Sequence, residues 1–267
     1  MDLTAVTSVR TARARADLAL APGERYPAGG TWLLSEPQPD VTGLVDLTGL
    51  GWDRVERGDD GDVRIGAMTT IRALERWAAA QTFPAAGLFG QCAESLLASF
   101  KVRHAATIGG NIARSYAAGA MIALAATLDA TAVIVTADGD ARTVPVAALP
   151  TGNGTTSLAH GEVIEAVVIP AAALEARTAH RRIALAQHGR SGALLTGRRG
   201  RDGECTFVIT AATATPTVLR YPTLPDADVL AADARAASGY YTDALGAADW
   251  RREVSAVLLD EVRKELA

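Results

Sequence analysis

The sequence predicts an α+β fold in two domains. Helical and strand-like segments are mixed along the chain without the strict alternation of a βαβ protein. Beyond residue 180, four apolar segments follow one another, and the turn at 198–203 joins two of them, which indicates an antiparallel meander. At about 150 residues per domain, the 267 residues correspond to roughly two domains. We expect the first domain at 1–170, with subdomains 1–57 and 58–170, and the second at 171–267.

The first half of the chain is expected to alternate between short strands and helices. Residues 5–20, rich in alanine and arginine, predict a helix, and 44–47 and 63–66 predict strands closed by glycines. Thr70 is a suitable N-cap for a helix at 71–80. A further helix is expected after Pro84, with Leu88, Cys92 and Leu96 on one face.

The same sequence patterns predict the elements in the middle and at the end of the chain. Residues 107–111 are expected in a loop, 118–130 in a buried helix, and 132–135 and 163–169 in strands. The meander comprises 180–186, 192–197, 204–212 and 216–221. Two helices end the chain. The last, at 249–266, is predicted to bury one face, formed by Trp250, Val254, Val257, Leu258, Val262 and Leu266.

Composition indicates an ordinary globular protein that binds neither nucleic acid nor membranes. Hydrophobic residues make up 49% and charged residues 21% of the chain. The net charge of −4 and the pI of about 5.6 disfavour a general nucleic-acid binder, whose surface is basic. No apolar run is long enough to span a bilayer, and the N-terminus lacks the pattern of a secretory signal. We therefore expect a cytoplasmic protein.

The chemistry-bearing residues do not suggest a metal site or a nucleophilic site. Cys92 and Cys205 stand alone, so neither a thiolate zinc site nor a self-contained iron–sulfur cluster is expected, and each is interpreted as a small buried hydrophobe. The four histidines have no metal-ligand spacing. The glycine signatures of Rossmann, P-loop and hydrolase sites are also missing.

Two glycine pairs remain as candidates for a binding site. One lies in Ala28-Gly29-Gly30-Thr31-Trp32-Leu33-Leu34, and the other in Ala106-Thr107-Ile108-Gly109-Gly110-Asn111-Ile112. A Gly-Gly turn admits positive φ, and its successive N–H groups can form an anion-binding concavity. Either pair alone could be a plain tight turn. Together they suggest a pyrophosphate held between two loops.

These two motifs, with the strand Leu44-Val45-Asp46-Leu47 between them, resemble the FAD-binding medium subunit of the molybdenum hydroxylases, which include xanthine, carbon monoxide and aldehyde dehydrogenases. The resemblance extends to Glu162-Val163-Ile164, Ile169-Pro170 and Arg181-Arg182. It implies a two-part FAD-binding domain of the vanillyl-alcohol oxidase or PCMH type, followed by a small α/β C-terminal flavoprotein domain.

The resemblance also implies which residues contact FAD. Ala28, Gly29, Gly30, Thr31, Trp32 and Leu33 would surround the pyrophosphate from one side, and Thr107, Ile108, Gly109, Gly110 and Asn111 from the other. Ile164 would pack near the flavin ring, or serve only as core. Arg182 would face the isoalloxazine, where a cation stabilises reduced flavin, or remain solvated. No catalytic residue and no metal ligand is expected.

Three positions depart from the pattern of that family. Trp32 replaces the usual Asp or Ser. The segment Ser115-Tyr116-Ala117-Ala118-Gly119 lacks the aspartate that many relatives place after the second motif. Arg114 brings a charge next to the cofactor loop, either to pair with a phosphate or as an exposed side chain.

The resemblance implies a role as an FAD-dependent oxidoreductase subunit. Electrons would pass from a molybdopterin-containing large subunit, through an iron–sulfur subunit or domain, to this FAD and then to an acceptor such as NAD or oxygen. One alternative is a stand-alone FAD oxidoreductase acting on a small molecule, with Tyr116 or His188 as proton donor. The other is a flavin-free assembly subunit, suggested by Trp32 and Gly119.

Overall fold

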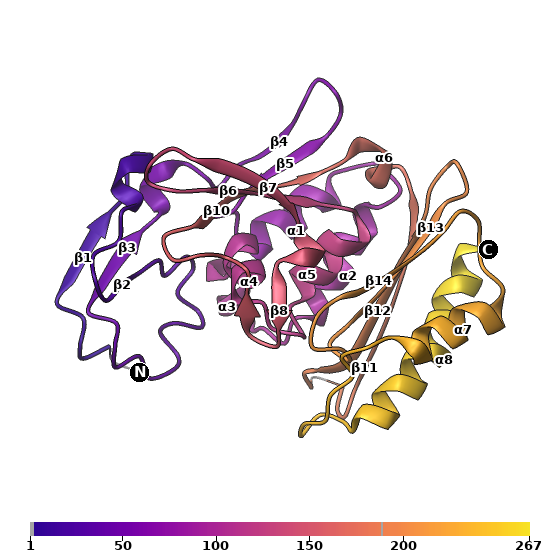
Figure 1. Ribbon diagram of the computed structural model, residues 1–267. Helices are drawn as coiled ribbons and strands as arrows, with labels where there is room; N and C mark the ends of the chain where they lie inside the picture. The colour runs from indigo at the N-terminus through magenta and orange to yellow at the C-terminus, as the bar shows by residue number, and fades with distance from the viewer. Residues whose placement is uncertain (1–2, 188) are drawn as a thin grey trace.

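The computed structural model describes residues 3–187 and 189–267, and its strands form three main sheets (Figure 1). The first is a three-stranded parallel sheet near the N-terminus. It contains β1 (Ser8–Thr11), β3 (Gly43–Asp46) and β2 (Glu24–Arg25), in that order, with β3 in the centre. Its apolar residues, Val45 among them, pack with Met68 and Val163 of the next sheet region. The first sheet is thereby fixed against the second.

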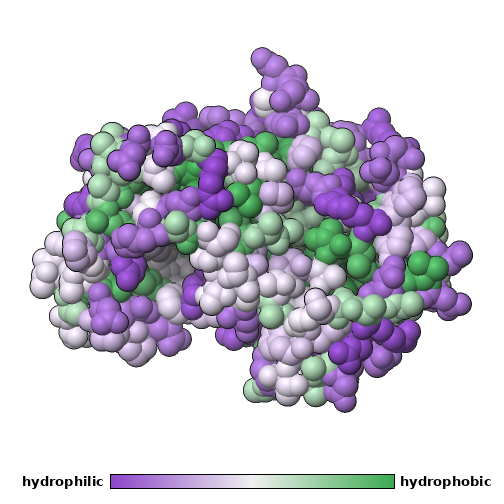
Figure 2. Space-filling view, in the orientation of Figure 1, coloured by the Kyte–Doolittle hydropathy of each residue, from purple (hydrophilic) through white to green (hydrophobic). Residues whose placement is uncertain are grey.

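The second sheet has five antiparallel strands in the order β4-β5-β10-β6-β7. These strands are β4 (Val55–Arg57), β5 (Val63–Gly66), β10 (Val163–Ile169), β6 (Thr131–Val135) and β7 (Ala141–Pro145). The β4–β5 hairpin projects from the body, and its tip is hydrophilic (Figures 1 and 2). Because β4 already pairs with β5, we place the border between the first two sheets between Leu50 and Val55, slightly before residue 57.

Five short helices pack beneath this sheet. They are α1 (Ile71–Ala79), α2 (Ala86–Ser95), α3 (Phe100–Ala105), α4 (Ile108–Arg114) and α5 (Ala120–Thr127). The hydroxyl of Thr70 accepts a hydrogen bond from the Ala73 amide at 3.1 Å, so the N-cap prediction is confirmed. All eight residues of α5 are buried, because α5 lies between the helix layer and the C-terminal sheet.

The C-terminal sheet is the antiparallel meander predicted from the sequence. Its order is β11 (Arg177–Ala184), β12 (Ser191–Arg199), β13 (Cys205–Thr210) and β14 (Thr217–Tyr221). One face packs on α5, and α8 (Ala248–Leu266) covers the other, with α7 (Ala227–Ala236) packed beside it (Figure 1). A short helix, α6 (Ala171–Leu174), connects this unit to the second sheet, and β8 (Pro150–Gly152) pairs with β9 (Thr155–Thr156) in a small hairpin.

Two sequence-based predictions of local structure are wrong, and a third is wrong in part. Residues 5–20 form β1 and the 3₁₀ turn Arg15–Leu18, because pairing with β3 overrides the helix propensity of alanine and arginine. Residues 108–111 begin helix α4 and do not form a loop. In α8 the predicted face is wrong only in part. Val262 and Leu266 are buried, and Val254 and Leu258 pack against the core, as expected. Val257, however, is exposed, whereas Arg251, Ser255 and Leu259 are buried.

The prediction for the two cysteines is confirmed. Cys92 and Cys205 are both buried and free, as expected for small hydrophobes, and burial raises the pKa of each thiol. Within residues 3–187 and 189–267, His, Cys, Asp and Glu side chains do not gather into groups that could hold a metal ion. None of the helices in the same ranges is both long enough and apolar enough to cross a membrane.

Candidate functional site

A cavity of about 750 Å³ is lined by residues of the first glycine motif, the helix layer, β10 and the C-terminal unit. This volume is in the range of small-molecule and cofactor sites, about 300–1,000 Å³. Its walls come from the first glycine motif, from the segment 95–119, from β10 and from the C-terminal unit. The residues that line it include Tyr26, Ala28, Gly29, Gly30, Thr31, Trp32, Leu33, Thr107, Gly109, Gly110, Asn111, Arg114, Tyr116, Ile164, Arg190, Tyr241, Asp243 and Leu245.

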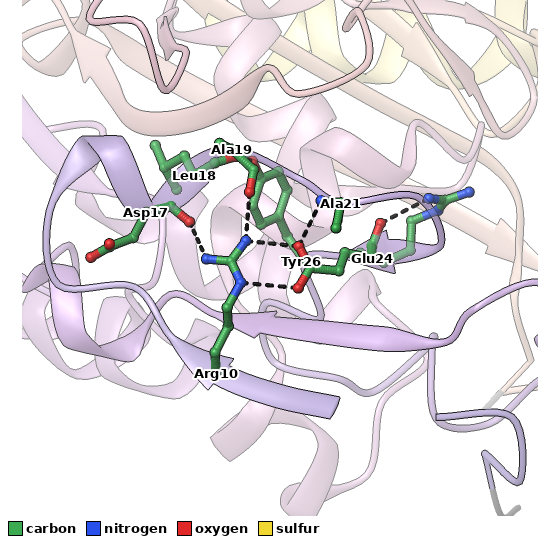
Figure 3. A network of polar contacts seen from close by, with 8 residues as sticks. Arg10, Asp17, Leu18, Ala19, Ala21, Glu24 and Tyr26 are labelled. Carbon is green, nitrogen blue, oxygen red and sulfur yellow. Dashed lines mark hydrogen bonds and ion pairs between the residues drawn. The ribbon is translucent and has the colours of Figure 1, made fainter. Parts of the chain in front are cut away.

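The first glycine loop begins at a rigid polar network, shown in Figure 3. Arg10 donates to both carboxylate oxygens of Glu24, at 2.9 and 2.7 Å, and the Ala21 amide donates to the same carboxylate at 2.8 Å. These donors lower the pKa of Glu24 to about 2, with the Arg10 hydrogen bond as the largest cause. Two residues later, the Tyr26 hydroxyl donates to the Leu18 carbonyl. The network thus fixes the chain where it enters the loop.

The loop itself turns through positive φ and packs against helix α3. Ala28 and Gly30 have φ of 47° and 69°. Gly29 lies so close to α3 that an added Cβ would stand 1.9 Å from the Ala105 carbonyl oxygen. Only glycine fits this close approach. Gly30 is therefore required by the positive φ of the turn, and Gly29 is required by its close contact with Ala105.

The backbone amides of this loop indicate an anion-binding site. Among the described residues, the N–H groups of Ala28, Gly29, Thr31, Trp32 and Leu33 have no hydrogen-bond partner, whereas Gly30 donates to the Pro27 carbonyl at 2.7 Å. The five open amides belong to residues that line the cavity. Consecutive unpaired N–H groups are costly unless water or a ligand satisfies them. Their arrangement suits a phosphate or pyrophosphate group.

The second glycine motif is built differently. Ile108 and Gly109 donate to the carbonyls of Thr69 and Ala67 at 3.0 and 2.9 Å, and the Gly110 amide donates to the Thr107 hydroxyl at 3.1 Å. Asn111 donates to the Thr107 carbonyl at 3.0 Å, so these four amides are used within the protein. This differs from the expected pair of equivalent amide concavities. The second glycine motif forms one wall of the cavity. The open amides belong to the first glycine motif.

Glycines also allow this wall to approach its neighbours. An added Cβ at Gly109 would lie 2.5 Å from the Ala67 side chain, and one at Gly110 would lie 3.2 Å from the Ala28 side chain. The Asn111 side-chain oxygen accepts from the Met121 amide at 3.1 Å and so caps the start of α5. Its NH₂ group keeps its donors for a ligand in the cavity.

The remaining sequence-predicted residues separate into two groups. Ile164 on β10 is almost fully buried and also lines the cavity, which fits both of its expected roles. Ile108 is buried in the core and does not line the cavity. Arg182 does not line it either: its guanidinium donates to the Ser191 hydroxyl at 2.9 Å and to the Gly189 carbonyl. Arg182 therefore fixes the loop between β11 and β12. The neighbouring candidate His188 lies outside the described residues.

Sequence reasoning missed one wall of the cavity. Arg190, Tyr241, Asp243 and Leu245 come from the C-terminal unit, and their spacing carried no motif that could have identified them. The buried Arg251 holds this wall in place: it stacks over the Tyr241 ring at 4.0 Å, pairs with Asp243, and donates to the Ala211 carbonyl at 2.8 Å. This carbonyl also accepts from the Tyr241 hydroxyl at 3.0 Å.

A glycine loop with open amides on a cavity of this size has the features of a dinucleotide-binding site. The family model described as the FAD binding domain in molybdopterin dehydrogenase matches residues 4–172. The chain therefore belongs to this family, and FAD is its cofactor. The residues present fit FAD, because the loop with five unpartnered amides lines a cavity of the required size.

Known proteins give the same result. The aldehyde oxidoreductase FAD-binding subunit PaoB of Escherichia coli (strain K12) is 36% identical over 101 residues, which are 34% of this chain and 29% of that protein. The match thus spans less than a third of that relative.

Among solved structures, the Cu,Mo-CO dehydrogenase in its cyanide-inactivated form has a chain with a TM-score of 0.83 and 24% identity, with 98% of both chains covered. A chain of quinoline 2-oxidoreductase from Pseudomonas putida 86 gives 0.80 and 21%, covering 100% of this chain and 98% of that one. At these identities the likeness is one of fold, and it confirms the predicted fold class.

Proposed function

We propose that this chain is the FAD-binding electron-transfer subunit of a molybdenum-containing hydroxylase or dehydrogenase. In such a complex it would receive electrons from iron–sulfur clusters of a partner, which in turn serve a molybdopterin-containing large subunit. The electrons would leave to an external acceptor such as NAD or oxygen. Family membership supports the proposal, as does the similarity to the E. coli relative, which is the FAD-binding subunit of an aldehyde oxidoreductase.

The single observation that carries the proposal is the first glycine loop with its five open amides on the cavity. Bound FAD supplies the redox chemistry. The residues of this chain hold and orient the cofactor: the loop amides bind its pyrophosphate, Asn111 offers its NH₂ group, and Ile164 forms an apolar surface for the ring. Arg190 adds a positive charge at the C-terminal wall, which would favour an electron-rich flavin.

The two other readings of the sequence find less support in the site. Tyr116, a proton-donor candidate of the stand-alone enzyme, is engaged by Arg114, which donates to its hydroxyl at 2.7 Å. A flavin-free assembly subunit has no use for a glycine loop with open amides, although Trp32 and Gly119 depart from the family pattern.

The proposal is tested by a visible spectrum of the purified chain, with identification of the released flavin, followed by reduction assays. We expect bound FAD that candidate metabolites do not reduce in the isolated chain. When the chain is purified with its partners, the substrate of the complex should reduce the flavin. Rapid reduction of the isolated chain by a small molecule would refute the subunit role in favour of a stand-alone oxidoreductase. Partner binding without flavin would favour the assembly subunit.

A further inference from the structure

Three aromatic and basic side chains form a stack at the edge of the cavity. The guanidinium carbon of Arg114 lies 3.7 Å from the centroid of the Trp32 ring and 4.3 Å from that of the Tyr116 ring. The two rings meet edge to face, with their centroids 6.3 Å apart. All three residues line the cavity. The arginine is thus held by the site and is not a freely solvated side chain.

Hydrogen bonds connect this stack to three separate segments of the chain. Trp32 belongs to the first glycine loop, and Arg114 is the last residue of α4. Arg114 donates to the Gly154 carbonyl at 3.0 Å, and Gly154 donates to the Ser115 carbonyl at 2.8 Å. The guanidinium therefore links the glycine loop to the second motif and to the β8–β9 hairpin. A side chain held on several sides keeps one orientation in the cavity.

The guanidinium still has hydrogen-bonding capacity. Arginine carries five N–H donors, and the described residues accept from one on each terminal nitrogen. The third nitrogen, Nε, is buried and has no partner among the described residues, and a ligand in the cavity does not reach it. The second N–H of each terminal nitrogen remains for the oxygens of a phosphate.

The charge of Arg114 is also not neutralised within the described residues. The cavity is lined by the carboxylates of Glu36, Glu162 and Asp243. Glu162 is paired with Arg142 and Asp243 with Arg251, whereas no described carboxylate forms an ion pair with Arg114. Trp32 belongs to the loop that carries the open amides, and the guanidinium of Arg114 stacks on its ring. This positive charge can therefore attract an anion that the loop binds.

We propose that Arg114 is a positioning residue for the FAD pyrophosphate. It holds the glycine loop by stacking on Trp32, and it supplies the positive charge that the amides alone lack. The proposal rests on the FAD-binding site described above and concerns cofactor recognition, not electron transfer. A chain that binds FAD through Arg114 and yet accepts no electrons from a partner would refute the proposed function and leave this proposal intact.

The test compares FAD with riboflavin, which lacks phosphate, on the full-length chain freed of flavin. The variants are Arg114→Met, Arg114→Lys and the control Arg76→Met, at an exposed arginine of α1 that forms no ion pair with the described residues. Flavin fluorescence gives the affinities. We expect Arg114→Met to weaken FAD binding about 10- to 100-fold, as for a lost charge-assisted hydrogen bond, and riboflavin binding by less than about threefold. Arg76→Met should change neither affinity.

Salt dependence gives a second, independent readout. Because exposed charges are screened by salt, FAD binding to the wild-type chain should weaken as salt is raised, and Arg114→Met should lose part of this dependence. Arg114→Lys keeps the charge and should keep the salt dependence. Unchanged FAD affinity in Arg114→Met, or an equal loss for FAD and riboflavin, would overturn the proposal. If Arg114→Met does not fold, Arg114→Lys decides: loss of the salt dependence would overturn it.

Discussion

At the scale of single residues, the cavity depends on backbone contacts that a side chain would prevent. Gly29 and Gly109 are the clearest cases, because an added Cβ would meet the Ala105 carbonyl oxygen at 1.9 Å and the Ala67 side chain at 2.5 Å. The first contact packs one glycine motif on α3, and the second packs the other motif on the segment after β5. At the opposite wall a side chain fixes the cavity: the buried guanidinium of Arg251 pairs with Asp243 and stacks over the Tyr241 ring.

We predict that Gly29→Ala weakens FAD binding at least about tenfold, because the loop must move away from α3 and its open amides move with it. Isothermal titration of the flavin-free chain measures the affinity. The control is Gly87→Ala, in helix α2, where an added methyl group meets no atom within 4 Å. That change should leave FAD binding unaltered and stabilise the fold by about 0.5–1 kcal/mol. Wild-type affinity in Gly29→Ala would refute the packing argument.

At the scale of elements, a histidine joins the C-terminal sheet to the helix layer. His180 on β11 shares a hydrogen bond of 2.8 Å with the hydroxyl of Ser95, the last residue of α2. Burial, as the largest cause, and the positive charges of Arg181 and Arg182 together lower the pKa of His180 to about 4. The imidazole is therefore neutral in the folded protein at neutral pH.

This pKa predicts a pH dependence of stability. The folded pKa lies below that of the unfolded chain, about 6.5, so the contribution is complete above pH 6.5 and is lost as pH falls toward 4. Between these limits the unfolded state binds more protons. We expect wild type to lose about 3 kcal/mol more than His180→Gln over this range, since the terminal amide of glutamine takes the place of the Nε2 that bonds Ser95 but does not titrate. Urea unfolding at several pH values measures the difference. Parallel curves for the two proteins would contradict the prediction.

At the scale of the whole molecule, the cavity is completed by both halves of the chain. The Ala211 amide donates to the Ala117 carbonyl at 2.7 Å, and α5 packs on β12 and β13. We propose that the boundary after Pro170 separates two units that share this surface. A cluster of buried residues that lies wholly beyond residue 170 supports that division, and the central cluster takes in Leu194 and Ala211 at the shared surface.

We predict that residues 1–170 produced alone lose both stability and FAD. Truncation would expose the apolar face of α5 to water and would remove Tyr241, Asp243 and Leu245 from the cavity. The expected result is aggregation, or a soluble fragment whose FAD affinity is at least about tenfold below that of the full chain. Size-exclusion chromatography and flavin fluorescence distinguish these cases. A soluble fragment with full-chain affinity would show that the C-terminal wall contributes nothing to binding.

Much of the fold could be read from the sequence, because it depends on local patterns. The apolar period of 71–80, the alternating strands beyond residue 180 and the uniformly apolar segment 118–130 each correspond to an observed element. The prediction for 5–20 was wrong because β1 is determined by its partner β3, which lies more than thirty residues away. Local propensity does not include such a pairing.

The sequence by itself determined the two glycine motifs, the α+β class and the resemblance that led to FAD. The tertiary structure alone decided which amides remain open, because those of Ile108 and Gly109 find partners in Thr69 and Ala67, on a segment about forty residues earlier. It also decided that Arg114 lies between two aromatic rings and that the C-terminal unit closes the cavity. The physical reason is the same in each case: a hydrogen bond or a stacked contact depends on which distant segment folds against a residue, and sequence spacing does not record that.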